Sequence, residues 1–205
     1  MEVSPHNGRL PIQPSPITFL DAFDADREEW QVVIETPKRS HNKFKHDQHR
    51  QVFILNDVLP EGMSFPYDFG FLPATLGDDG DPLDVLLLTD EPTFCGCVVP
   101  SRLIGVIEAE QTETDGQGER NDRLVAVPCK ARAYANLKSL KDMDRNLLDE
   151  IEQFFVSYNR VHEKRFKVLG LHGPATAEKL AKHGMRRHNK QSGKRNGGKK
   201  KKRKK

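Results

Sequence analysis

Apolar and β-branched residues occur in short runs that are separated by turn signals. Gly, Pro, Asn or Asp bound most of these runs, as expected for strands that end in turns. Few helical patterns lie between them, which argues against strand–helix–strand units and predicts an antiparallel sheet or a small barrel. The predicted strands cover residues 30–35, 51–58, 83–88, 102–109 and 123–129, and a polar loop covers 110–122.

Helical periodicity appears only late in the chain. Apolar residues recur every three or four positions between 147 and 158, which predicts an amphipathic helix with Asp144 as its N-cap. A second, short helix is predicted over residues 174–184. The stripe of the first helix comprises Leu147, Leu148, Ile151, Phe154, Phe155 and Tyr158.

The two ends of the chain lack patterns that build a core. Residues 1–28 are rich in Pro and polar side chains and are expected to form a loosely ordered N-terminal arm. Residues 185–205 repeat Lys, Arg, Asn and Gly and are expected to form a disordered basic tail. One domain, over residues 29–184, remains between them, consistent with a chain of 205 residues.

The net charge of +3 conceals a split between body and tail. Residues 182–205 hold 13 of the 33 Lys and Arg and no Asp or Glu, so residues 1–181 carry 20 basic and 30 acidic side chains, a net charge of −10. Seven consecutive cations, 199–205, are typical of a segment that binds nucleic acid or another polyanion. However, the tail has no interleaved aromatic residues for base stacking, and an acidic body repels phosphate backbones.

Several classes of protein are excluded by what the chain lacks. No segment approaches the roughly 20 apolar residues of a membrane span, and residues 1–20 show no secretory signal. The three cysteines, Cys95, Cys97 and Cys129, have neither framework nor CxxC spacing, which favours a reduced compartment. A cytoplasmic protein is therefore expected.

The stretch DDGDPLDVLLL, residues 78–88, places four carboxylates within seven residues at the start of an apolar run. Asp-Gly and Gly-Asp-Pro are turn signals, so a solvated loop is one interpretation. Strand alternation, however, puts Asp84 on the same face as Leu86 and Leu88 in a strand that is apolar on both faces. A carboxylate there needs a partner, and with Asp79 and Asp81 it forms a set of hard oxygen ligands suited to Mg²⁺. A divalent-metal site is the favoured interpretation.

The order of several motifs resembles the soluble family I inorganic pyrophosphatases. The signature is DGDPLDV, residues 79–85, which matches the family's D-G-D-P-x-D-V, and the resemblance extends over roughly 30–172. The flanking motifs are VVIETP at 32–37, NKFK at 42–45, FPYDFGF at 65–71, RLIGV at 102–106, RLVAVP at 123–128 and FFVSY at 154–158.

The resemblance implies a mainly β fold: a small closed β-barrel of the OB type with two helices near the C-terminus. It implies Mg²⁺-dependent hydrolysis of diphosphate to two phosphates by a homo-oligomer, often a hexamer in bacteria. By position, Asp79, Asp81 and Asp84 are expected to ligate metal, with Asp81 as the general base. Also carried over are the phosphate contacts Lys43 and Tyr158, and Glu35 at the edge of the site. Lys45 and Arg123 are expected to add cationic contacts to phosphate, and Asp122 (or Asp115) to substitute for a missing metal aspartate.

The chain also departs from the family pattern, which marks it as a divergent member. The family has Glu two residues after the lysine at 43, two tyrosines in the aromatic stretch, a cation near the end of the second strand, two later metal aspartates and a lysine after the tyrosine at 158. In this chain Lys45 replaces the Glu, Phe65 and Phe69 replace the tyrosines, and Asp57 replaces the cation. Gln111 and Asn121 replace the metal aspartates, and Asn159 replaces the lysine. Two alternatives to diphosphate hydrolysis are hydrolysis of another phosphoanhydride and a non-enzymatic OB-like module that binds nucleic acid through its tail.

Overall fold

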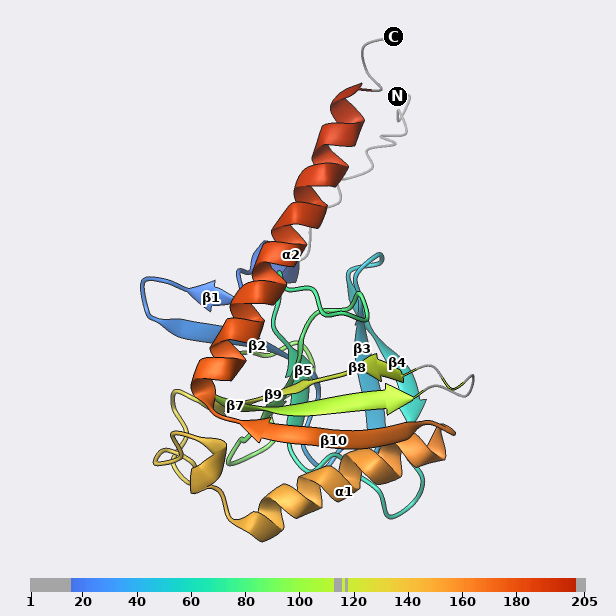
Figure 1. Ribbon diagram of the computed structural model, residues 1–205, viewed down its shortest axis with the longest axis vertical. Coiled ribbons are helices and arrows are strands. Elements are labelled where there is room, and N and C mark those ends of the chain that lie inside the picture. Colours follow the sequence, from blue (N-terminus) through green and yellow to red (C-terminus); the bar gives the residue numbers. More distant parts are fainter. Residues whose placement is uncertain (1–15, 113–115, 117, 202–205) are drawn as a thin grey trace, which may run out of the picture.

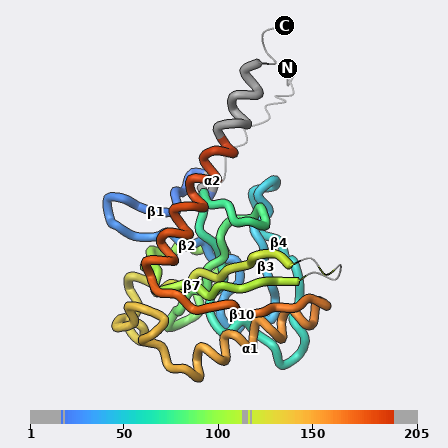
Figure 2. The backbone as a smooth tube through the Cα atoms, in the orientation of Figure 1, coloured from blue at the N-terminus to red at the C-terminus, as the bar shows by residue number. Residues whose placement is uncertain are grey.

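The computed structural model describes residues 16–112, 116 and 118–201, and its elements are traced in Figures 1 and 2. Five strands close into a ring, because β2 pairs with β5, β5 with β6, β6 with β9, β9 with β7, and β7 again with β2. The prediction of a mainly β fold with a closed set of strands and two helices is confirmed. The ring strands are β2 (Glu29–Thr36), β5 (Asp68–Phe71), β6 (Asp84–Leu87), β7 (Val98–Thr112) and β9 (Arg123–Pro128).

One pairing in the ring differs from the expected antiparallel sheet. β6 and β9 run parallel, with Val85 opposite Leu124, whereas the other described strand pairs are antiparallel. The ring also requires a glycine where β2 and β5 meet. A Cβ atom at Gly70 would lie 2.0 Å from the carbonyl oxygen of Val33, which leaves no room for any side chain.

Further strands extend the ring or stand beside it. β1 (Phe23–Asp24) pairs with β2, and β8 (Gly118–Arg120) and β10 (Arg165–His172) pair with β7. β3 (Asn42–Asp47) and β4 (Val52–Val58) form a separate hairpin. Strands β1, β3, β5, β8 and β10 were not predicted. β1, β5 and β8 are short and β3 is polar, whereas β10 is eight residues long and is defined by its pairing with β7.

The buried apolar residues form two clusters, one on each face of the central strands. Alternate residues of β6 and β9 belong to different clusters, so these strands are buried on both faces as expected. Leu86 packs in the cluster covered by α1 (Arg145–Val161), whose N-cap is Asp144 as predicted. Figure 1 shows α1 lying along β10. Asp84, at the start of β6, lies on the same face as Leu86 and so points toward the α1 side.

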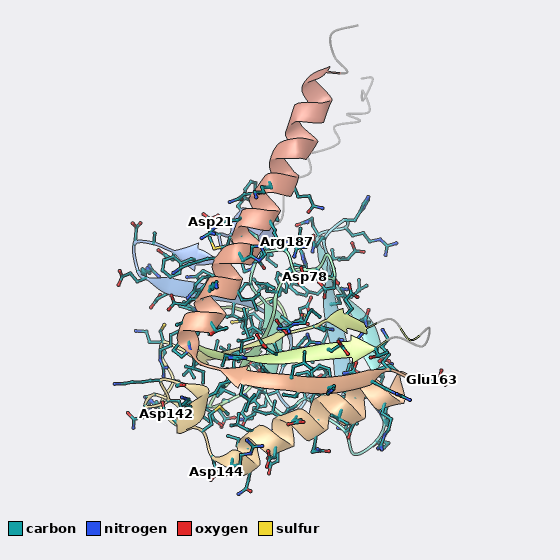
Figure 3. The ribbon with its side chains drawn as sticks, viewed as in Figure 1. Asp21, Asp78, Asp142, Asp144, Glu163 and Arg187 are labelled. Atoms are coloured by element: carbon teal, nitrogen blue, oxygen red, sulfur yellow. The ribbon has the colours of Figure 1, made fainter. Side chains whose placement is uncertain are left out.

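Helix α2 (Pro174–Lys201) covers the other cluster through Ala177 and Ala181. It begins at Pro174, as predicted, but continues past Gly184, where the sequence analysis placed its end. Residues 185–201, which we expected to be disordered, are helical in this structure and extend away from the strands (Figure 1). Residues 202–205 lie outside the described residues. Arg187 of α2 forms an ion pair with Asp78, and Figure 3 shows the two side by side.

Two smaller expectations also change. Part of the predicted N-terminal arm is ordered, because residues 16–28 contain a 3-10 helix (Pro16–Phe19), β1 and the fully buried Ala22, while residues 1–15 lie outside the description. The predicted loop 110–122 is shortened by the hairpin of β7 and β8.

A second 3-10 helix, Leu140–Asp142, precedes α1. No helix in the described part of the chain is long and apolar enough to cross a membrane.

Candidate active site

A cleft of about 560 Å³ opens at the rim of the ring, between the β3–β4 hairpin, the start of β6 and the end of α1. It brings together eight of the nine residues that the sequence analysis assigned to the site. The ninth, Asp122, does not line it. The eight are Glu35, Lys43, Lys45, Asp79, Asp81, Asp84, Arg123 and Tyr158.

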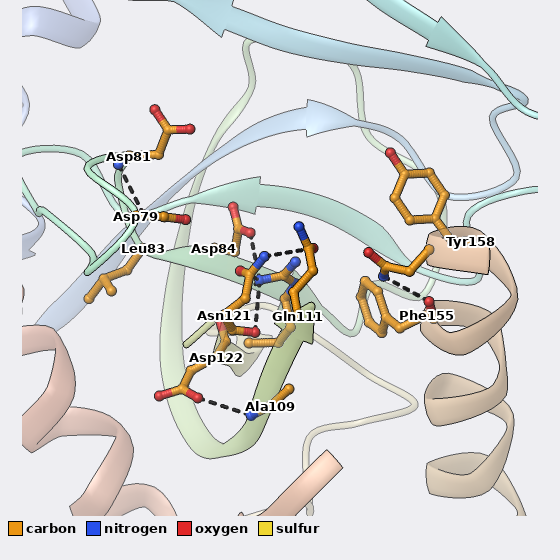
Figure 4. Close-up of polar contacts among 12 residues, drawn as sticks. Asp79, Asp81, Leu83, Asp84, Ala109, Gln111, Asn121, Asp122, Phe155 and Tyr158 are labelled. Atoms are coloured by element: carbon orange, nitrogen blue, oxygen red, sulfur yellow. Dashed lines mark hydrogen bonds and ion pairs between the residues drawn. The ribbon is translucent and has the colours of Figure 1, made fainter. Parts of the chain in front are cut away.

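The loop that carries Asp79 and Asp81 is held by its own backbone. The amide of Gly77 donates to the carbonyl oxygen of Asp81 at 2.7 Å, and the amide of Asp81 donates to Oδ1 of Asp79 at 3.0 Å (Figure 4). Gly80 has φ +85°, which a glycine adopts without strain. The Asp-Gly turn therefore forms as expected and carries Asp79 and Asp81 side by side, while the divalent-metal site stays a prediction.

Asp81 contacts a cation from the hairpin. Nζ of Lys45 lies 2.9 Å from Oδ2 of Asp81, and both side chains are about half exposed. The hydrogen bond to Asp81 raises the pKa of Lys45 above its ordinary value. Lys45 was expected to bind substrate, yet here it neutralises a carboxylate.

Asp84 is paired with Arg123 because β6 and β9 run side by side in parallel. Nη1 of Arg123 donates to Oδ2 of Asp84 at 2.8 Å, and it also contacts the side chain of Asn121. The guanidinium lies 5.4–5.9 Å from three aromatic rings, those of Phe69, Phe155 and Phe166, and Arg123 is 6% exposed. Arg123 is thus a buried counter-ion of Asp84, which differs from the phosphate contact that we expected.

Two other carboxyl groups in the cleft are harder to ionise. Burial raises the pKa of Glu35 to about 7, with a smaller contribution from the charge of Asp84, although Oε1 of Glu35 accepts the amide of His46 at 2.7 Å. Burial also raises the pKa of Asp79, and the charges of Asp84 and Asp81 add to the rise. Carboxylates that repel one another in this way are stabilised by an added cation.

The opposite end of the cleft holds a cation and hydroxyl pair. Nζ of Lys43 donates to the hydroxyl oxygen of Tyr158 at 2.8 Å. The ring of His162 lies 4.8 Å from the ring of Tyr158, and its Nε2 is 3.0 Å from Oδ2 of Asp57. His162 therefore stands beside the position where Asp57 replaces the family's cation. Sequence reasoning missed it because no local spacing links it to residues 43 or 57.

The structure does not bring Asp122 to the metal site. Its carboxylate accepts the amide of Ala109 at 3.0 Å and pairs with Arg120, and Figure 4 shows it directed away from Asp79, Asp81 and Asp84. The neighbouring Asn121 and Gln111 line the cleft instead, and their side chains are hydrogen-bonded to each other at 3.0 Å. In this structure Asp122 is engaged by Ala109 and Arg120, and its assignment as a metal ligand stays a prediction.

Three other residues near the site, Asp115, Glu119 and Asn159, are placed as follows. Asp115, the alternative ligand, lies outside the described residues. Glu119, which the sequence analysis did not select, lines the cleft because β8 folds back along β7. Asn159 is buried and donates its Nδ2 to the carbonyl oxygen of Phe155. Within the described part of the chain, no three His, Cys, Asp or Glu side chains lie close enough together to hold a metal ion between them.

Comparison with known proteins shows the family to which this chain belongs. The sequence profile described as "Inorganic pyrophosphatase" matches residues 32–189, which is more than half of the chain. The chain belongs to the inorganic pyrophosphatase family. This confirms the resemblance drawn from the DGDPLDV signature.

Individual pyrophosphatases are similar over most of their length. The chain is 41% identical to the inorganic pyrophosphatase of Nostoc sp. over 79% of its own length and 86% of that protein. It is 43% identical to that of Synechocystis sp., over 68% and 79%. Among solved structures, the inorganic pyrophosphatase of Thermus thermophilus matches with a TM-score of 0.76 and 29% identity, covering 84% of this chain and 98% of that one. The family I pyrophosphatases to which these structures belong are metal-dependent enzymes with an OB-like fold.

Proposed function

We propose that this protein hydrolyses inorganic diphosphate to two phosphates in the cleft described above, with Mg²⁺ as its cofactor. One observation carries the proposal: a single cleft is lined by the carboxylates of Asp79, Asp81 and Asp84 and by the hydrogen-bonded pair of Lys43 and Tyr158. A tetra-anionic substrate needs both groups of side chains. The carboxylates would hold metal cations that bind some of its oxygens, and Lys43 and Tyr158 would bind other oxygens directly.

The donor set fits a hard divalent cation. Carboxylate oxygens are the ligands that Mg²⁺ prefers, together with water and phosphate oxygens. Burial and mutual repulsion raise the pKa of Asp79, so a cation beside it would stabilise its charged form. Asp79, Asp81 and Asp84 would hold the metal once their carboxylates converge on it, since in this structure Asp81 and Asp84 are engaged by Lys45 and Arg123. When bound, divalent cations supply an activated water and neutralise phosphate oxygens.

The side chains of this protein would perform the remaining steps. Lys43 and Tyr158, which are already hydrogen-bonded to each other, would bind and orient a phosphate group. Asp81, half exposed at the mouth of the cleft, would accept the proton of the attacking water. Arg123 would hold Asp84 in position, since its guanidinium is buried and engaged there. Glu35, hydrogen-bonded to the backbone of β3, would form the edge of the site.

The test measures phosphate released from diphosphate by the full-length protein, with and without Mg²⁺. Mg²⁺-dependent release is expected, and Asp81→Asn should slow it by about 10²–10⁴-fold, as for loss of a general base. Absence of release from the correctly folded protein would contradict the proposed function. Release that survives Asp81→Asn undiminished would contradict only the role given to Asp81.

The expected homo-oligomer follows from the family, and the expected cytoplasmic location follows from the cysteine spacing and the missing secretory signal. A cytoplasmic homo-oligomer remains our proposal, and light scattering coupled to size-exclusion chromatography would test the assembly; a monomer would contradict it. The relatives carry the names of pyrophosphatases, so the nucleic-acid partner suggested by the basic tail gains no support.

A further inference from the structure

The cleft contains cations at positions where they compete for the carboxylates that a metal needs. Of the three aspartates in DGDPLD, Asp81 is paired with Lys45 and Asp84 with Arg123. Asp79 forms no ion pair within the described part of the chain, and its Oδ1 accepts the backbone amide of Asp81. Two of the three carboxylates are therefore already neutralised by the chain itself.

The two cations differ in how firmly they are held. The Arg123 side chain is 7% exposed and packs against three aromatic rings, so its contact with Asp84 is part of the core. The Lys45 side chain is 47% exposed and that of Asp81 is 51% exposed, and the pair joins the β3–β4 hairpin to a loop. Exposed pairs of this kind contribute little net stability and exchange partners readily.

The place that Lys45 reaches also matters. It lies two residues from Lys43 on β3, so both side chains line the cleft, and Lys43 contacts Tyr158 at the phosphate end. An ammonium that leaves Asp81 therefore remains inside the cleft, on the side where anionic oxygens would bind. Lysine is suited to this exchange because its charge sits at the end of four rotatable methylene groups.

We propose that Lys45 is an exchangeable internal counter-ion, which holds Asp81 until a divalent cation takes that carboxylate and then turns to the phosphate of the substrate. This inference rests on the metal site of the proposed function and adds a residue that tunes it. The consequence is a weaker metal site than the three aspartates alone would form, since each metal that binds Asp81 must first displace an ammonium. Metal binding and phosphate binding are coupled through this one side chain.

The test measures affinity for Mn²⁺ alone, without substrate, by the loss of the electron paramagnetic resonance signal of the free ion. Lys45→Met, which keeps much of the side-chain length and removes the charge, should tighten Mn²⁺ binding by about two- to fivefold, the range for an exposed pair. Lys45→Arg should leave the affinity close to that of the wild type. Lys182→Met serves as a matched control, because Lys182 pairs with Glu178 on the exposed face of α2.

A double-mutant cycle separates exchange at Asp81 from a general effect of charge. In an Asp81→Asn background, Lys45→Met should no longer tighten Mn²⁺ binding, because the competed carboxylate is absent. An equal gain in Mn²⁺ affinity in the wild-type and Asp81→Asn backgrounds, or no gain in the wild-type background, would overturn the proposal. Lys43→Met provides a second comparison: it removes the same charge from the cleft without freeing Asp81, and a gain as large as that of Lys45→Met would also overturn it.

These results are distinguishable from the fate of the proposed function. If the wild type releases phosphate but Lys45→Met leaves Mn²⁺ affinity unchanged, the exchange is wrong and the function stands. If Mn²⁺ affinity changes as expected but no phosphate is released, the displacement of Lys45 by metal stands, and both the function and the turn of Lys45 to a substrate phosphate are wrong. Circular dichroism of each variant, compared with the wild type, confirms that the fold is retained.

Discussion

The buried carboxyl group of Glu35 makes the stability of this protein depend on pH in a defined direction. Glu35 is 8% exposed, and burial raises its pKa from 4.5 to about 7. In the unfolded chain the group ionises near its ordinary value, so between these two values the unfolded state loses a proton that the folded state keeps. Stability contributed by this group is therefore present at low pH and falls as pH rises from 4.5 to about 7.

The magnitude follows from the linkage between proton binding and folding. With these two pKa values, the free energy of unfolding should fall by about 2.5 kcal/mol between pH 5 and pH 8 through Glu35 alone. Glu35→Gln removes this dependence, because the amide does not ionise. It keeps the carbonyl oxygen that accepts the amide of His46, so little packing changes.

The assay is urea denaturation at pH 5, 6, 7 and 8 in the presence of a metal chelator, for the wild type and Glu35→Gln. The difference in unfolding free energy between the two proteins is the measured quantity, because other titrating groups cancel in it. Glu178→Gln, the same substitution on the exposed part of α2, controls for the loss of one carboxylate. A difference that is constant with pH, or that favours the wild type as pH rises, would refute the reasoning.

Three further predictions concern the frame of the site and are measured by denaturation without metal. Gly70→Ala should destabilise the protein by about 3 kcal/mol or more, because the new Cβ meets the carbonyl oxygen of Val33 in the ring; a loss below 1 kcal/mol would show that the strands can separate there. Arg123→Met should cost about 3 kcal/mol, since it leaves the partly buried Asp84 without its counter-ion; a neutral effect would mean that Asp84 is solvated. Asp144→Ala removes the N-cap of α1 and should lower the melting temperature by about 2–4 °C, for a loss of about 1 kcal/mol; an unchanged melting temperature would contradict the role of the cap.

Short-range patterns in the sequence were sufficient for much of the fold. The strands predicted over residues 30–35 and 102–109 lie within β2 and β7, the one over 123–129 matches β9 to within one residue, and α1 begins after Asp144 as its capping residue indicated. Alternation also placed Asp84 correctly on the face of Leu86. These features depend on local periodicity and capping, which each segment carries by itself.

Features that depend on pairing between distant segments were not predictable in this way. β3 reads NKFKHD and has no apolar alternation, so only its pairing with β4 makes it a strand. The predicted end of α2 at Gly184 was also wrong. Residues after Gly184 combine weak helix formers with a high positive charge, which favoured an end there, yet the helix continues to Lys201. An ion pair from Arg187 to Asp78 ties part of that extension to the carboxylate loop.

By itself, the sequence determined which residues approach the site: the DGDPLD carboxylates, Lys43, Lys45, Arg123 and Tyr158 come from motifs whose order identifies the family. Only the tertiary structure decided how these residues are paired. The parallel contact of β6 and β9 gives Asp84 to Arg123, the β3–β4 hairpin gives Asp81 to Lys45, and the β7–β8 hairpin turns Asp122 away. The physical reason is that charges act over a few ångströms in space, whereas a motif specifies only neighbours along the chain.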